Sequence, residues 1–92
     1  MRIAWRTSAR ADMLDIAEYI DIDNPAAALA VVEDIHHQIA RLTLYPKMGR
    51  AGRIEATREL VIRRTPFIAV YTIEPEAVVI LRVLHGAQRW PR

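Results

Sequence analysis

The side chains best suited to chemistry gather at the carboxyl-terminal end of this chain. Its last eight residues, 85–92, hold one histidine, two arginines and one tryptophan. Guanidinium groups bind phosphate and carboxylate oxygens through paired hydrogen bonds. The Trp90 ring can stack on a nucleic-acid base, although packing back onto the protein is the simpler role for an indole. Any active surface is therefore expected at this basic end.

A second group of cations lies in the loop at residues 45–53, where one proline and two glycines interrupt the regular pattern. Lys47, Arg50 and Arg53 lie in this loop and could meet phosphate groups. The loop lacks the Gly-Lys-Ser/Thr ending of a nucleotide-binding loop, which excludes that class of site.

Charge is distributed unevenly along the chain, although the net charge is only +2. Residues 12–34 hold seven acidic side chains and no lysine or arginine, whereas residues 41–92 hold ten basic side chains and four acidic ones. Such polarity steers a polyanion or an acidic protein segment toward the second half. The alternative is a solubilising surface that is merely uneven.

Composition excludes several other classes. A chain of 92 residues forms one domain, residues 1–92. It has no cysteine, which excludes disulfides, thiolate metal sites and cysteine catalysis. His36 and His37 are adjacent and point about 100° apart around a helix, so we expect no metal site there. No cofactor is expected either. No signal peptide or membrane span is recognisable, and a cytoplasmic protein without membrane contact is expected.

Three apolar segments predict strands ahead of the basic end. Residues 66–73 and 77–84 are rich in β-branched and aromatic residues, and the three residues between them are enough for a hairpin turn. Both runs are apolar at nearly every position, so we expect both faces of their sheet to be at least partly covered. A further strand is predicted at 57–64, with Leu60 and Ile62 on one face.

The first half predicts a short strand at residues 2–6 and two helices. Apolar residues recur at helical spacing over 8–21, with Ser8 expected as the N-cap. Asn24 and Pro25 suit the N-cap and first turn of a second helix, predicted to run to about Leu44. The fold class is therefore α+β, in the order β-α-α-β-β-β. An antiparallel sheet carries the helical hairpin on one face.

The spacing of several short motifs makes the chain recognisable. They are Ala9-x-x-Asp12-Met13-x-x-Ile16-x-x-Tyr19-Ile20, Asn24-Pro25, Leu42-x-x-Tyr45-Pro46-x-Met48-Gly49-Arg50, Thr57-Arg58-Glu59-Leu60, Val70-Tyr71 and Ile80-Leu81-Arg82-Val83-Leu84-His85-Gly86. In this order they resemble toxins of the RelE/ParE superfamily over almost the whole chain. The resemblance implies the toxic half of a type II toxin–antitoxin module, of the kind that stabilises plasmids and inhibits growth. It also implies a cognate antitoxin that wraps the folded toxin.

The superfamily divides by target, and the resemblance implies two mechanisms. RelE-like members cleave mRNA on the ribosome. For that reaction Arg63 matches a phosphate-binding arginine, His85 lies near a terminal catalytic histidine, and Arg89 is a third candidate. The chain departs from that pattern, since Gln88 occupies the place of a catalytic arginine and Gly86 follows the histidine. ParE-like members poison DNA gyrase and perform no hydrolysis.

We expect a ParE-like gyrase poison, with a RelE-like ribosome-dependent mRNA endonuclease as the alternative. A non-toxic module that only binds its antitoxin is the third possibility. The side chains expected to bind the target or the antitoxin are Arg50, Arg53, Arg58, Arg64, Arg82 and Trp90.

The candidate residues also have purely structural explanations. Arg63 could pair with Glu59 on the same strand face. His85 could hold the end of its strand. Arg82, assigned by strict alternation to the face opposite Leu81 and Val83, is expected in an ion pair that is buried or faces the antitoxin.

Overall fold

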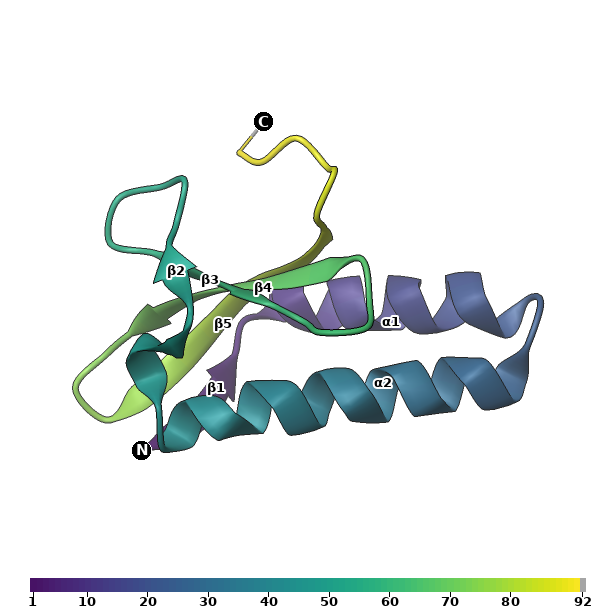
Figure 1. The fold of residues 1–92 in the computed structure, drawn as a ribbon, viewed down its shortest axis with the longest axis horizontal. Helices are drawn as coiled ribbons and strands as arrows, with labels where there is room; N and C mark the ends of the chain where they lie inside the picture. The colour runs from purple at the N-terminus through teal and green to yellow at the C-terminus, as the bar shows by residue number, and fades with distance from the viewer. Residues whose placement is uncertain (92) are drawn as a thin grey trace.

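The computed structural model describes residues 1–91 and contains two long helices and five strands (Figure 1). Arg92, the last residue of the predicted basic end, lies outside the described residues. The elements in chain order are β1 (Arg2–Trp5), α1 (Thr7–Asp21), α2 (Pro25–Ala40), η1 (Arg41–Thr43), η2 (Pro46–Met48), β2 (Arg50–Ala51), β3 (Arg58–Val61), β4 (Phe67–Ile73) and β5 (Ala77–His85).

The strands form one sheet in the order β1-β5-β4-β3-β2. The predicted α+β class is confirmed, but the sheet is mixed, because β1 runs parallel to β5 while the other pairs are antiparallel. A two-residue strand, β2, was not predicted. Short turns force β3, β4 and β5 to alternate in direction. The pairing of β1 with β5 joins segments about 75 residues apart. The local sequence pattern carries no information about such a distant pairing.

The helix ends agree only in part with the sequence prediction. Asn24 is the N-cap of α2, and its Oδ1 accepts a hydrogen bond from the Ala27 amide at 3.1 Å. The prediction for Ser8 was wrong, since α1 begins at Thr7 without a side-chain cap. The Ser8 hydroxyl instead donates to the Leu81 carbonyl oxygen at 2.8 Å. The second helix ends at Ala40 rather than near Leu44.

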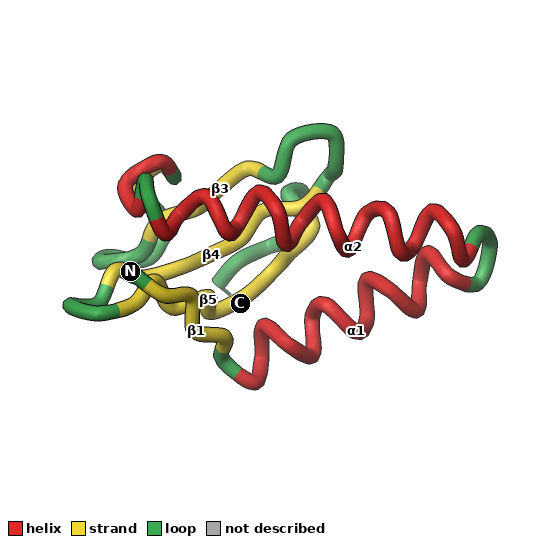
Figure 2. The backbone as a smooth tube through the Cα atoms, turned by 90° about the horizontal axis from the view of Figure 1, so that it is seen from below, coloured by secondary structure: helices red, strands yellow, loops and turns green. Residues whose placement is uncertain are grey.

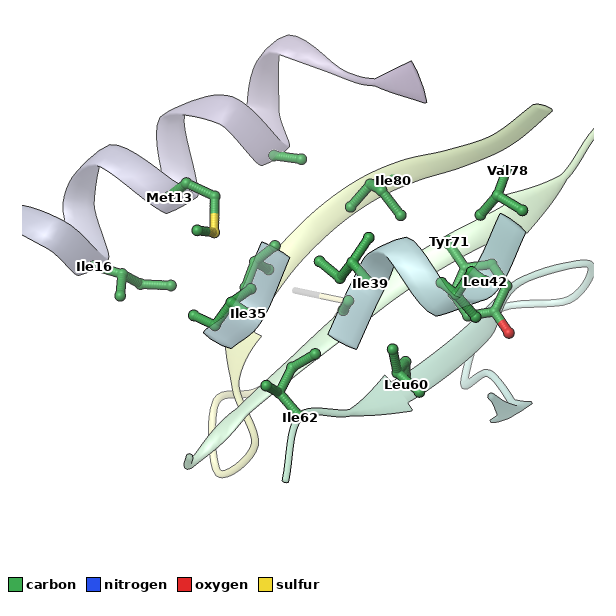
Figure 3. Close-up of a cluster of buried hydrophobic side chains, with 13 residues drawn as sticks. Met13, Ile16, Ile35, Ile39, Leu42, Leu60, Ile62, Tyr71, Val78 and Ile80 are labelled. Carbon is green, nitrogen blue, oxygen red and sulfur yellow. The ribbon is translucent and has the colours of Figure 1, made fainter. Parts of the chain in front are cut away.

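The main core lies between the helical hairpin and one face of the sheet (Figures 2 and 3). Its fully buried large side chains come from both layers and include Ile35, Ile39, Leu42, Ile62, Tyr71, Val78 and Ile80. A smaller cluster covers the other face, where Trp90 packs against Ile68, Val70 and Leu84. The prediction that both faces of the sheet are at least partly covered is therefore confirmed.

The Tyr71 hydroxyl fastens the loop before β2 to the core. It donates to the Pro46 carbonyl oxygen at 2.6 Å and accepts from the Gly49 amide at 2.9 Å. Burial raises the pKa of this phenol, although the hydrogen bond from Gly49 and the charge of Arg58 act in the opposite direction. The loop that carries Lys47 and Arg50 is therefore held by a buried side chain of the central strand β4.

We expect Tyr71→Phe to lower the free energy of unfolding by about 1–3 kcal/mol, because two polar groups lose their buried partner. The effect should depend on pH. The phenol has a pKa near 10 in the unfolded state and a raised pKa in the folded state. The stabilisation by its hydrogen bonds is therefore complete below about pH 10. It is lost as the pH rises through the raised pKa of the folded state. Urea unfolding at successive pH values measures both effects. If the free energies of unfolding of the wild type and of Tyr71→Phe changed in parallel with pH above pH 10, this pH dependence would be contradicted.

Candidate functional site

The first turns of α1 close the edge of β5 that β1 leaves uncovered. β1 ends at Trp5, and beyond it the Arg6 amide donates to the Ile80 carbonyl oxygen at 3.0 Å. The carboxylate of Asp12 accepts from the Val83 amide at 2.9 Å. The amide of Arg6, which precedes α1, and the side chain of Asp12 therefore take the place of a missing strand along this part of β5.

Asp12 also binds the guanidinium group of Arg82 through two hydrogen bonds. Nε of Arg82 lies 2.7 Å from Oδ2, and Nη2 lies 2.9 Å from Oδ1. The hydrogen bond to Asp12 raises the pKa of Arg82 above its ordinary value, although burial acts in the opposite direction. The Trp90 ring packs 5.5 Å from the guanidinium carbon. The predicted ion pair of Arg82 thus forms within the chain.

A β-bulge explains why alternation misplaced the residues around Arg82. Val70 pairs with Arg82 whereas Tyr71 pairs with Ile80, which leaves Leu81 as the extra residue. As a result Leu81 packs in the cluster with Trp90, while Val83 joins the main core. The prediction that Leu81 and Val83 share a face was therefore wrong.

A buried carboxylate organises the loop between β2 and β3. The side chain of Glu59 is 1% exposed and lies 3.3 Å from Arg50 Nη2 and 3.4 Å from Arg53 Nε. It also accepts from the Arg53 amide at 3.0 Å, and Arg53 Nη1 donates to the Gln88 carbonyl oxygen at 3.3 Å. Glu59 thus holds two of the predicted binding arginines and, through one of them, the tail. The sequence prediction missed this role of Glu59.

Arg63 and Arg64 lie in the turn between β3 and β4. The side-chain amide of Gln38 accepts from the Arg63 amide at 2.7 Å and donates to its carbonyl oxygen at 3.0 Å. Arg64 has a φ of 67° and pairs with Asp34 at 3.1 Å. The suggested pair of Arg63 with Glu59 is wrong, since Arg50 and Arg53 bind that carboxylate.

His85 ends β5, and its ring lies edge-on to Phe67 at 6.0 Å between centroids. Its Nδ1 accepts a hydrogen bond from the Ala87 amide at 3.1 Å. A neutral imidazole that accepts at Nδ1 carries its proton on Nε2. In this arrangement Nδ1 is occupied by the Ala87 amide, so a role as a general base would require that hydrogen bond to break.

The three residues considered for RNA cleavage do not share one cleft. Arg63 lines a cleft of about 350 Å³ between the end of α2, η2 and β3. His85 lines a larger cleft of about 710 Å³ together with Arg64, Arg82 and Gln88. Arg89 is exposed in the tail. Arg58, one of the predicted binding residues, is half-buried on β3 opposite Tyr71.

Within residues 1–91, no group of three or more His, Asp or Glu side chains is arranged to hold a metal ion. In the same range, no helix is both long and apolar enough to cross a membrane.

The sequence model of the ParE toxins of type II parDE toxin–antitoxin systems matches residues 3–90. The chain belongs to the ParE toxin family. This ParE-family toxin is 43% identical over 91 residues to a putative toxin, Y4kP, of Sinorhizobium fredii, covering 99% of this chain and 94% of the relative. It is 30% identical over 87 residues to toxin RelE2 of Caulobacter vibrioides, covering 95% and 97% of the two chains.

Solved structures agree with this assignment. A chain of the chromosomal ParDE toxin–antitoxin system of P. aeruginosa superimposes with a TM-score of 0.85 at 28% identity, covering 92% of this toxin and 95% of that chain. A chain of the toxin–antitoxin complex RelBE2 of Mycobacterium tuberculosis gives a TM-score of 0.59 at 31% identity, covering 95% and 92%. The resemblance to RelE/ParE toxins found in the sequence is thereby confirmed, and the protein is a toxin of this type II family.

Proposed function

We propose that this ParE-family toxin is held inactive by a cognate antitoxin and, once released in the cytoplasm, arrests growth by poisoning DNA gyrase. The observation that carries the proposal is the TM-score of 0.85 to the P. aeruginosa ParDE chain, against 0.59 to the RelBE2 chain. Sequence identity is nearly equal for the two, at 28% and 31%. Shape therefore favours the ParE branch where identity does not distinguish the branches.

The positions of the three catalytic candidates also support a binding role over a catalytic one. RNA cleavage requires cations that face the developing phosphorane charge and a group that handles the 2′-hydroxyl proton. Arg63 and His85 line different clefts, and Arg89 is exposed in the tail. His85 also uses Nδ1 as an acceptor for the Ala87 amide. The three candidates therefore do not line one cleft together.

An antitoxin partner is supported by the two solved structures, which are a ParDE toxin–antitoxin system and a RelBE2 toxin–antitoxin complex. A partner that binds only the folded state stabilises it by mass action, which suits a domain of 92 residues with a small core. The predicted binding residues remain the proposed contacts with target or antitoxin: Arg50, Arg53, Arg58, Arg64, Arg82 and Trp90.

The alternative is a ribosome-dependent mRNA endonuclease that uses Arg63, His85 and Arg89. It is favoured by the 30% identity to toxin RelE2 of Caulobacter vibrioides. A third possibility is a module that binds antitoxin without toxicity.

Induction of the protein alone in bacteria separates these functions. We expect incorporation of a labelled amino acid to continue over the first minutes while the chromosome acquires double-strand breaks. A prompt stop in translation with an intact chromosome would replace the proposal with the endonuclease. Unimpaired growth at full expression would leave only antitoxin binding.

The variants Arg63→Ala and His85→Ala are expected to keep full toxicity, because gyrase poisoning requires no proton transfer. If either residue performed the chemistry of RNA cleavage, toxicity should fall by about two orders of magnitude or more. Killing curves at matched expression measure the difference, and circular dichroism of the purified variants verifies that each is folded. Loss of toxicity in a folded His85→Ala protein would contradict the binding-only mechanism.

A further inference from the structure

Along the outer edge of β3, the backbone amide and carbonyl groups of every second residue point away from β4. The Ile62 amide donates to the Phe67 carbonyl oxygen at 3.0 Å, and Val61 is aligned with Ile68. In an antiparallel ladder the bonded and non-bonded pairs alternate. The amide and carbonyl groups of Glu59, Val61 and Arg63 therefore point outward, to the side on which β2 lies.

Two of these three positions are closed by the chain itself. Arg50 of β2 pairs with Glu59. At the other end the Gln38 side chain donates to the Arg63 carbonyl oxygen and accepts from its amide, as a residue of a neighbouring strand would. Between them, no residue within 1–91 forms a backbone hydrogen bond with the outward groups of Val61. The edge thus has a gap one residue wide, closed on both sides.

This gap opens into the cleft of about 350 Å³ lined by Gln38, Arg41, Met48 and Arg63, and also by the paired side chains of Arg50 and Glu59. Val61 is 49% exposed and Met48 is 39% exposed. The guanidinium groups of Arg41 and Arg63 form no ion pair with any residue in 1–91. The cleft therefore combines a backbone donor and acceptor, an apolar surface and two cations that lack counter-charges.

We propose that this cleft docks an acidic segment of a partner protein in extended conformation, with one of its residues paired to Val61. Addition of a strand to an exposed edge supplies an amide and a carbonyl at once. Carboxylates on either side of the paired residue would meet Arg41 and Arg63. The proposal concerns a site on the toxin and does not depend on which cellular target it inhibits.

Two other occupants fit less well. A nucleic-acid phosphate backbone supplies only acceptors and leaves the Val61 carbonyl without a donor. A second copy of this chain, pairing edge to edge, would bring the arginines of both copies together without carboxylates between them. An extended acidic segment satisfies both the backbone groups and the charges.

The test uses the full-length toxin labelled with ¹⁵N and a blocked seven-residue peptide that alternates glutamate with valine. At a peptide concentration of about 1 mM, binding worth only about 4 kcal/mol can be detected. We expect changes in the amide chemical shifts of Val61, Arg41 and Arg63. Hydrogen exchange of the Val61 amide should slow at least twofold, which is the factor expected when half of the sites are occupied. The same peptide with lysine in place of glutamate should have no effect. Unchanged exchange at Val61, or equal binding of the lysine peptide, would overturn the proposal.

Variants localise the effect. Val61→Pro removes the outward amide without removing any internal hydrogen bond, and proline is tolerated at a solvent-facing strand edge. We expect it to weaken binding of the acidic peptide at least tenfold, whereas the matched control Val61→Ala keeps the amide and should bind like wild type. Arg63→Glu, which leaves the backbone intact, should also weaken binding if Val61→Pro fails to fold. A concentration-dependent dimer that Val61→Pro abolishes, measured by sedimentation, would overturn the proposal in favour of self-pairing.

Discussion

Replacing Asp12 with alanine is expected to lower the free energy of unfolding by about 2–4 kcal/mol. The Asp12 carboxylate accepts two hydrogen bonds from Arg82 and one from the Val83 amide. The side chains of Asp12 and Arg82 are only 12% and 30% exposed, so water replaces the carboxylate poorly. Its loss leaves a guanidinium group and a strand-edge amide without their partner in a largely desolvated place.

This loss would be a large share of the total free energy of unfolding of a domain of this size. Globular domains have free energies of unfolding of about 5–15 kcal/mol, and small domains lie near the lower limit. Urea unfolding followed by circular dichroism measures it. Asp15→Ala, on the same helix and exposed, is the matched control and should change stability by less than about 0.5 kcal/mol. Asp12→Asn should fall between the two, since it keeps an acceptor for Val83 and loses the charge. Equal unfolding midpoints for Asp12→Ala and Asp15→Ala would show that the helix does not hold this edge of β5.

Gly49→Ala is expected to destabilise the protein by about 2–3 kcal/mol through overpacking alone. A Cβ atom on Gly49 would lie 2.6 Å from the Tyr71 hydroxyl oxygen, 2.7 Å from its Cε1 and 3.0 Å from the Glu59 carbonyl oxygen. The φ of −71° at this glycine suits any residue, so backbone strain contributes nothing. Tyr71 is fully buried and cannot retreat without losing its bonds to the loop.

Gly86→Ala is the matched control for this substitution. A Cβ atom there would meet only the Pro66 carbonyl oxygen, at 3.3 Å, in an exposed turn. We expect a change below about 1 kcal/mol. Thermal unfolding of both variants beside wild type provides the measurement. A Gly49→Ala protein as stable as Gly86→Ala would mean that the loop at 45–49 moves freely relative to Tyr71.

The parts of this protein that depend on neighbours within a few residues could be predicted from the amino-acid sequence alone. Apolar spacing located both helices, and Asn24 with Pro25 marked the start of α2, because capping acts over three residues. The β-branched runs located β4 and β5, joined by a turn too short for any connection but a hairpin. The motifs around Asp12 and Arg82 indicated the toxin family, and the comparisons confirm it.

Features that join residues far apart in the chain could not be predicted and became visible in the folded structure. The parallel pairing of β1 with β5, the bond from Ser8 to Leu81 and the pairing of Asp12 with Arg82 each span about 70 residues or more. The bulge at Leu81 reversed the alternation on which the faces of β5 had been predicted. Gln38 closes the edge of β3 from a helix 25 residues away. Local propensity carries no information about such contacts, because packing of the two layers determines which polar groups meet.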